Sequence, residues 1–360
     1  MKIINKSKYK ILKKIKINKN IFFKNIKIVF EKIFYKKKNK LILLCHALTG
    51  SHHFSGIYKN NLKNIGWWNK IIDEYLLNLN LNFLCINNIN SNFGTTNNFS
   101  YNPLINKKYN NNFPKIKLLD WTKVQYKFIK IKLKINKIFI IIGGSFGGMQ
   151  LLLWSLIYPN FSKNYICIAS TGKMSKNNLI KNKINKLLIN YSKNIFNKNY
   201  YTYNVKSIKT LKLLRIISHL YYMSKYDIKN QFLIKNFYKN YKIFNKKINI
   251  SEYFFFKSNN FYKNFNINSY LYIICIINKF NFKLINNKNI FLLNYFIISF
   301  KNDKRFFYKN SEILINFFIK KKNNINYKII YNYKGHDSFL IKDIFYKNLI
   351  KLYINYISER

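Results

Sequence analysis

The sequence predicts an α/β fold with a doubly wound, mostly parallel sheet. Short continuous apolar runs, which are typical of strands buried on both faces of such a sheet, recur along the chain. They alternate with segments of helical period, as βαβ units require. One of these runs leads through a glycine-rich turn directly into an expected helix, and this turn makes the fold class more specific.

The expected elements follow in chain order. Residues 21–36 alternate between apolar and polar side chains, which favours early strands. A helical spacing of apolar residues predicts helices over 120–134 and 146–158. The Asn-rich patch 109–112 is typical of a loop. Continuous apolar runs predict further strands at 41–45, 83–86, 138–142, 165–169, 295–300 and 327–331.

The most informative motif is GGSFGG at residues 143–148, directly after the apolar run 138–142. A serine flanked as G-x-S-x-G between a strand and a helix is the nucleophile elbow of the α/β-hydrolase fold, which is therefore the fold we predict. In so tight a turn, side chains at Gly143 and Gly147 would collide with neighbouring backbone. Ser145 is the predicted nucleophile.

A serine nucleophile needs a base and an acid that orients the base. In this fold they follow late strands in the order Ser, Asp or Glu, His. Asp303 follows the run 295–300, and His336 follows the run 327–331. Ser145, Asp303 and His336 therefore form the predicted catalytic triad.

An oxyanion hole in this fold combines two backbone N–H groups. One belongs to the residue after the nucleophile, Phe146, and the other to a loop after an early strand. Leu48 is the predicted second donor. The nearby His46 is expected to be a packed or hydrogen-bonded loop residue, and the pair at 52–53 has no carboxylate or cysteine pattern beside it, so no metal site is predicted.

The composition is strongly basic, with 65 Lys and Arg against 11 Asp and Glu and a net charge of +54. Such a balance can indicate a polyanionic partner. The lysines are spread along the whole chain without a nucleic-acid-binding motif, so we expect no specific nucleic-acid partner. Lys, Asn, Ile, Phe and Tyr are the residues that A/T-rich codons encode, so the few remaining Gly, Ala and Arg residues are informative.

The four cysteines are widely spaced, which favours buried thiols in a reducing cytoplasm. The N-terminus lacks a clean apolar segment, so no signal peptide is expected. The uncharged run 138–162 is long enough to span a bilayer, but a strand, an elbow and a helix explain it better, and no membrane partner is predicted. The segment 173–288 is poor in Gly and has lysine-rich helical patterns.

With these motifs in place, the chain resembles the homoserine O-acyltransferases of the α/β-hydrolase superfamily over nearly its whole length. The matching segments are HALTGSHH at 46–53, GWW at 66–68, FGTT at 93–96, DW at 120–121 with Gln125, GGSFGGMQ at 143–150, WSLIYP at 154–159, IAST at 168–171, LR at 214–215 with His219, NSYL at 268–271 and GHDSFL at 335–340.

The resemblance implies a core of residues 1–172 and 289–360 with a helical lid inserted at 173–288. It implies a cytoplasmic homodimer in methionine biosynthesis, with an acyl-CoA as co-substrate and no other cofactor. The mechanism would be ping-pong, from the acyl-CoA to Ser145 and then to the hydroxyl of L-homoserine. Arg215 and Asp337 match the residues that bind the amino acid, and an arginine fork and a carboxylate suit its two charges.

Arg305 bears on the choice of acyl donor. By the resemblance, members that transfer acetyl have an apolar residue here, and the succinyl branch of proteobacteria has arginine. Succinyl-CoA carries a free carboxylate that acetyl-CoA lacks, and a partly buried arginine can discriminate between them. Succinyl-CoA is therefore the favoured donor, with acetyl-CoA as the alternative.

Two other classes remain open from the sequence. A serine esterase or other hydrolase would use the same triad with water as acceptor, although water needs no amino-acid clamp of the kind that Arg215 and Asp337 offer. A non-catalytic remnant or a basic RNA-associated protein would need no intact triad.

Overall fold

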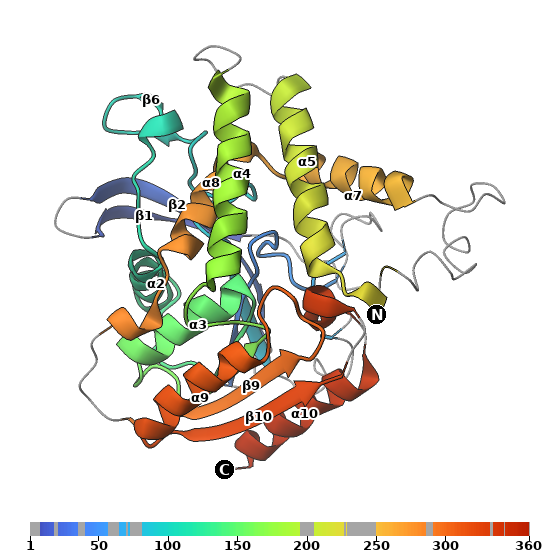
Figure 1. Ribbon diagram of the computed structural model, residues 1–360. Coiled ribbons are helices and arrows are strands. Elements are labelled where there is room, and N and C mark those ends of the chain that lie inside the picture. The colour runs from blue at the N-terminus through green and yellow to red at the C-terminus, as the bar shows by residue number, and fades with distance from the viewer. Residues whose placement is uncertain are drawn as a thin grey trace.

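The computed structural model describes residues 8–17, 21–34, 40–56, 65–69, 71–72, 81–194, 205–226, 228, 250–285, 291–331, 334–341 and 343–359. Its centre is an eight-stranded sheet in the order β1-β2-β4-β3-β7-β8-β9-β10 (Figure 1). The strands are β1 (Lys8–Lys16), β2 (Phe22–Ile33), β3 (Leu41–Cys45), β4 (Asn82–Ile86), β7 (Ile140–Gly144), β8 (Asn164–Ile168), β9 (Asn294–Phe300) and β10 (Asn324–Ile330).

Six neighbouring strands, from β4 to β10 in the sheet order, run parallel to one another. The hairpin of β1 and β2 adds an antiparallel edge, because β2 runs against both β1 and β4. The predicted α/β-hydrolase fold with a doubly wound sheet is confirmed by this topology. All the predicted strands are present within a few residues, whereas β1 was not predicted.

Alternate side chains of the central strands point to opposite faces of the sheet and pack into two separate cores. Leu41, Leu43 and Cys45 of β3 face the larger core, and Ile42 and Leu44 face the other. Both faces are buried, which explains why the run is continuously apolar. The larger core is covered by α2 (Leu118–Lys127), α3 (Phe146–Ile157) and α9 (Lys309–Lys320), and the smaller by α10 (Ile344–Ser358).

In the described part of the segment between β8 and β9, there are four α-helices. Figure 1 shows α4 and α5 side by side on the far side of α3 from α9 and β10, with α7 and α8 beside them. They are α4 (Lys176–Asn194), α5 (Val205–Tyr222), α7 (Ile250–Asn264) and α8 (Ile267–Asn278). The helical pattern expected in 173–288 is present in the described part of this segment, and the domain boundaries stay a prediction.

Two local predictions need correction. The patch 109–112 is not simply a loop, because residues 110–112 form a short 3-10 helix whose flanking Tyr109 and Phe113 rings pack on each other and on Phe23. The helix expected over 120–134 ends as α2 at Lys127 and continues as a π-helical segment, Phe128–Lys132.

The turn after β7 brings the backbone of α3 against the end of β3. A Cβ on Gly147 would overlap the carbonyl group of Cys45, and one on Gly143 would overlap the backbone of Gly147. The predicted collisions are therefore confirmed. Ser145 has φ of 56° in this turn, a strained conformation for a residue with a side chain.

His46 ties the loop after β3 to the loop after β4. Its Nε2 accepts the N–H of Asn88 at 3.0 Å, and its Nδ1 lies 2.8 Å from the carbonyl oxygen of Ala47, to which it donates. Both nitrogens are thus satisfied in the neutral ring. Burial lowers the pKa of His46 to about 4, and the hydrogen bond to Ala47 opposes part of this shift. His46 is the packed loop residue that the sequence predicted.

Among the described residues, no helix is long and apolar enough to span a membrane. The apolar run 138–162 is divided among β7, the elbow and α3, as expected from the sequence.

Gly147→Ala would place a methyl group against the Cys45 carbonyl, where backbone must move to make room. We expect the free energy of unfolding in urea to fall by about 3 kcal/mol. Gly50→Ala is the control, since its new methyl group would meet mainly the His46 side chain, with the nearest atom at 3.1 Å. Equal losses in the two variants would contradict the proposed steric role.

The stability of the fold should depend on pH through His46. Its pKa is about 4 when folded and about 6.5 when unfolded, so the unfolded chain takes up the proton first as the pH falls. Protonation should therefore remove about 2 kcal/mol of stability between pH 7 and pH 5. Urea unfolding of wild type and His46→Gln at both pH values tests this. A difference between the two proteins that stays constant with pH would count against it.

Candidate active site

The loops after three parallel strands meet at the carboxyl edge of the sheet, where parallel strands of α/β proteins place their functional residues. Ser145 follows β7, Asp303 follows β9, and His336 lies in a 3-10 helix, η6 (Gly335–Leu340), after β10. The structure brings these three residues together. His336 Nε2 lies 2.9 Å from Ser145 Oγ, and its Nδ1 lies 2.7 Å from Asp303 Oδ2.

The two carboxylate oxygens of Asp303 have separate partners. Oδ1 accepts the backbone N–H groups of Arg305 and Phe306, both at 2.8 Å. Oδ2 is left to face His336, so the ring carries its proton on Nδ1 and presents a free lone pair on Nε2 to the serine. The arrangement can remove the proton of Ser145 Oγ.

Packing holds the His336 ring in this orientation. The ring contacts Phe306, Phe339 and Tyr222, with centroid separations of 5.2, 5.8 and 5.6 Å. All three triad side chains are buried. Burial in a mostly aromatic shell excludes water and strengthens the electrostatic interactions within the triad.

The predicted oxyanion donors lie on the two loops next to the nucleophile. Phe146 is the first residue of α3, so its N–H has no intrahelical partner. Leu48 is buried in the loop after β3. In the part of the chain that the structure describes, neither N–H donates to a backbone carbonyl. Both groups remain available for an oxygen bound beside Ser145.

Ser170 also supports the elbow, although sequence analysis did not single out this serine. Its Oγ donates to the carbonyl oxygen of Ser145 at 2.7 Å, while the Ser145 N–H donates to Ile168 at 2.9 Å. The strained serine is thus held through its backbone on both sides. The family match at residues 168–171 was the only sequence signal for this role.

Arg305 is buried beside the triad. It is 6% exposed, and its Nη1 donates to the hydroxyl oxygen of Tyr222 at 3.1 Å. The Tyr222 ring in turn contacts His336. The Tyr222 ring thus contacts both Arg305, the predicted specificity residue, and His336, the predicted base. Tyr222 itself was not predicted, although it lies seven residues, or two helical turns, after Arg215 on α5.

Arg215 and Asp337 are half-buried. The guanidinium carbon of Arg215 lies 5.8 Å from the centre of the Tyr222 ring and 5.3 Å from that of Phe261, and its Nε has no hydrogen-bond partner. Asp337 directly follows His336 in η6, which contacts α5. The described residues include no ion pair between Arg215 and Asp337, so both charges are available to a ligand.

His53 forms hydrogen bonds with residues outside the triad. His53 Nδ1 is 2.8 Å from Oε2 of the buried Glu31. Across the described ranges, no group of three or more His, Cys, Asp or Glu residues is placed to hold a metal ion. The cysteines 45, 85 and 167 are buried thiols as predicted, and Cys275 is only partly buried.

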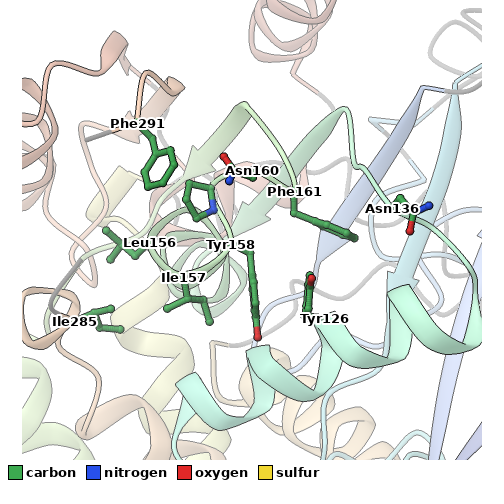
Figure 2. A pocket seen from close by; sticks show the side chains of 10 residues that line it. Tyr126, Asn136, Leu156, Ile157, Tyr158, Asn160, Phe161, Ile285 and Phe291 are labelled. Carbon is green, nitrogen blue, oxygen red and sulfur yellow. The ribbon is translucent and has the colours of Figure 1, made fainter. Parts of the chain in front are cut away.

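A cavity of about 610 Å³ (Figure 2) is lined in part by residues 156–161, at the C-terminal end of α3, whereas Ser145 precedes the N-terminal end of this helix. Its lining includes the stacked rings of Tyr126 and Tyr158, whose centroids are 3.8 Å apart. The twelve-residue helix separates it from the nucleophile by roughly 18 Å. Its described lining residues include no charged side chain and no serine or cysteine, and it lies at the far end of α3 from Ser145, so it is not the catalytic pocket.

Comparisons with known proteins agree with this geometry. A family model described as the alpha/beta hydrolase fold matches residues 40–343. The homoserine O-succinyltransferase of Cupriavidus metallidurans is 31% identical over 331 residues, which cover 89% of this chain and 85% of that protein. The enzyme of the same name from Cupriavidus taiwanensis is 30% identical over 331 residues, or 89% and 84% of the two chains.

Solved structures show the same fold. Homoserine O-acetyltransferase from Bacillus anthracis superposes with a TM-score of 0.85 at 16% identity, over 98% of both chains. Esterase E22 superposes with a TM-score of 0.82 at 18% identity, over 97% of this chain and 99% of that one. These distant structures show the fold, whereas the family model and the curated relatives show the family. The chain belongs to the homoserine O-acyltransferases of the α/β-hydrolase superfamily.

Proposed function

We propose that this enzyme transfers the succinyl group of succinyl-CoA to the hydroxyl of L-homoserine, as a step of methionine biosynthesis. The observation that carries the choice of donor is the buried Arg305, which is hydrogen-bonded to Tyr222 beside the catalytic base. A buried guanidinium favours a donor with a free carboxylate and gains nothing from an acetyl group. The names of the curated relatives support the same choice.

The first half-reaction forms an acyl-enzyme. Ser145 Oγ attacks the thioester carbonyl carbon while His336 Nε2 takes the hydroxyl proton. The N–H groups of Leu48 and Phe146 stabilise the negative oxygen of the tetrahedral intermediate. Its collapse breaks the C–S bond, and CoA leaves as the thiol with the proton returned by His336. Asp303 stabilises the imidazolium that forms in between.

The second half-reaction uses the same groups in reverse. The hydroxyl of L-homoserine attacks the ester carbonyl of the acyl-enzyme, and His336 Nε2 takes its proton. Breakage of the ester bond to Ser145 releases O-succinyl-L-homoserine and restores the serine hydroxyl with that proton. A single base therefore serves both steps, consistent with a ping-pong order.

The acceptor presents a carboxylate and an ammonium group. Arg215 on α5 would hold the carboxylate and Asp337 on η6 the ammonium, and these two elements contact each other. Binding at both ends would orient the hydroxyl toward the acyl-enzyme and lower the entropic cost of the attack. Water lacks both charged groups, so the clamp favours a transferase over an esterase.

Ser145→Ala should abolish CoA release from succinyl-CoA in the presence of L-homoserine. Loss of a serine nucleophile typically lowers kcat by about 10⁶-fold, so the residual rate should equal the blank. Ser155→Ala is the control, because this buried serine lies on the same helix and donates to the Leu152 carbonyl, away from the triad. Release by Ser145→Ala at the wild-type rate would refute the mechanism, and release without homoserine would indicate a hydrolase.

Arg305→Leu should lower kcat/KM for succinyl-CoA by about 100-fold, since a hydrogen-bonded charge pair contributes about 1.5–3 kcal/mol. The value for acetyl-CoA should stay the same or rise. Lys304→Leu, at the exposed neighbouring position, controls for the loss of one positive charge. A parallel fall with both donors would assign Arg305 a structural role only.

A further inference from the structure

Lys181 differs from the other lysines of this chain. In the described ranges it is the one lysine that is fully buried, at 3% exposure, although the sequence contains 62 lysines. It lies on α4, and its Nζ has no hydrogen-bond partner. A lysine that reaches solvent would need no explanation, but a buried amine without an acceptor does.

The surroundings of Lys181 are aromatic and positively charged. Its Nζ lies 3.6 Å from the centre of the Tyr221 ring and 5.2 Å from that of Tyr222. The guanidinium carbon of Arg305 lies 5.1 Å from the same Tyr222 ring. Two buried cations thus meet at one tyrosine, and that tyrosine contacts His336.

No carboxylate of the described residues forms an ion pair with either cation. The π faces of the tyrosines offset only part of the cost of burying two like charges together. Burial, and then the charge of Arg305, lower the pKa of Lys181 to about 6. An anion bound beside both groups would favour the charged form of Lys181 and offset both effects, so the pair suits an anionic ligand.

We propose that Lys181 and Arg305 together hold the terminal carboxylate of the succinyl group, so that Lys181 is a second residue that determines the choice of donor. The inference rests on the proposed succinyl transfer. The position beside His336 fits the acyl end of the donor, because the phosphates of CoA lie at the far end of its long pantetheine arm. An acetyl group carries no charge and gains nothing from Lys181.

The free amine is mostly neutral at pH 8 and about half protonated at pH 6, so binding of the carboxylate should take up a proton. KM for succinyl-CoA, divided by KM for acetyl-CoA, should therefore rise by about tenfold or more from pH 6 to pH 8. The charged and titratable groups that the structure places beside the amine are Arg305 and the phenols of residues 221 and 222. Arg215 and Tyr270 lie next to Tyr222 in turn. The ratio cancels any effect of His336 on both donors.

The test compares Lys181→Met, Lys181→Arg and the control Lys183→Met, whose lysine is exposed on the same helix. CoA release is measured with each donor at saturating L-homoserine. We expect Lys181→Met to lower kcat/KM for succinyl-CoA by about 30-fold, mainly through KM, and to leave acetyl-CoA within twofold. Lys181→Arg should retain most of the succinyl activity, and Lys183→Met should match wild type. Loss of an unpaired buried amine should leave Tm at or above the wild-type value.

A parallel fall with both donors, or no change with either, would overturn the role of Lys181 while leaving succinyl transfer intact. A wild-type enzyme that prefers acetyl-CoA would overturn the proposed function itself, and this is seen before any variant is made. If Lys181→Met does not fold, the pH dependence of the wild-type KM ratio decides, since a ratio that stays flat from pH 6 to pH 8 would also overturn the proposal.

Discussion

The active site depends on one close approach, between the start of α3 and the end of β3. Gly147 lies so near the Cys45 carbonyl that no side chain fits between them. This contact fixes the turn that strains Ser145 and sets the Phe146 N–H beside the loop of Leu48. Ser145 and the predicted oxyanion donors beside it are therefore placed by backbone packing rather than by side-chain contacts.

This turn could be predicted from the sequence because its tight backbone contacts require glycine, even in a chain whose composition disfavours glycine. A chain with ten glycines among 360 residues keeps four of them around one serine. The continuous apolar runs were equally clear, since strands buried on two faces tolerate few polar residues. The edge strand β1 was missed because its lysines face outward and only Leu12 and Ile15 of this strand are buried.

Residues that act through burial were harder to find. Lys181 is one of 62 lysines and Tyr222 one of 30 tyrosines, so neither stands out in the sequence. Only their positions in the structure set them apart. The Lys181 amine lies over an aromatic ring, and the Tyr222 ring contacts both Arg305 and His336. Arg305 could be singled out because arginine is rare here, so the biased composition hides some buried cations and exposes others.

The glycine before the catalytic histidine has a mechanical consequence. Gly335 has φ of 73°, and a Cβ there would overlap the backbone at Tyr222, the last residue of α5. Gly335, the residue before His336, therefore packs directly on the main chain at the end of α5, a helix outside the sheet. Displacement of the end of α5 would therefore carry His336 away from Ser145 and separate the predicted base from the predicted nucleophile.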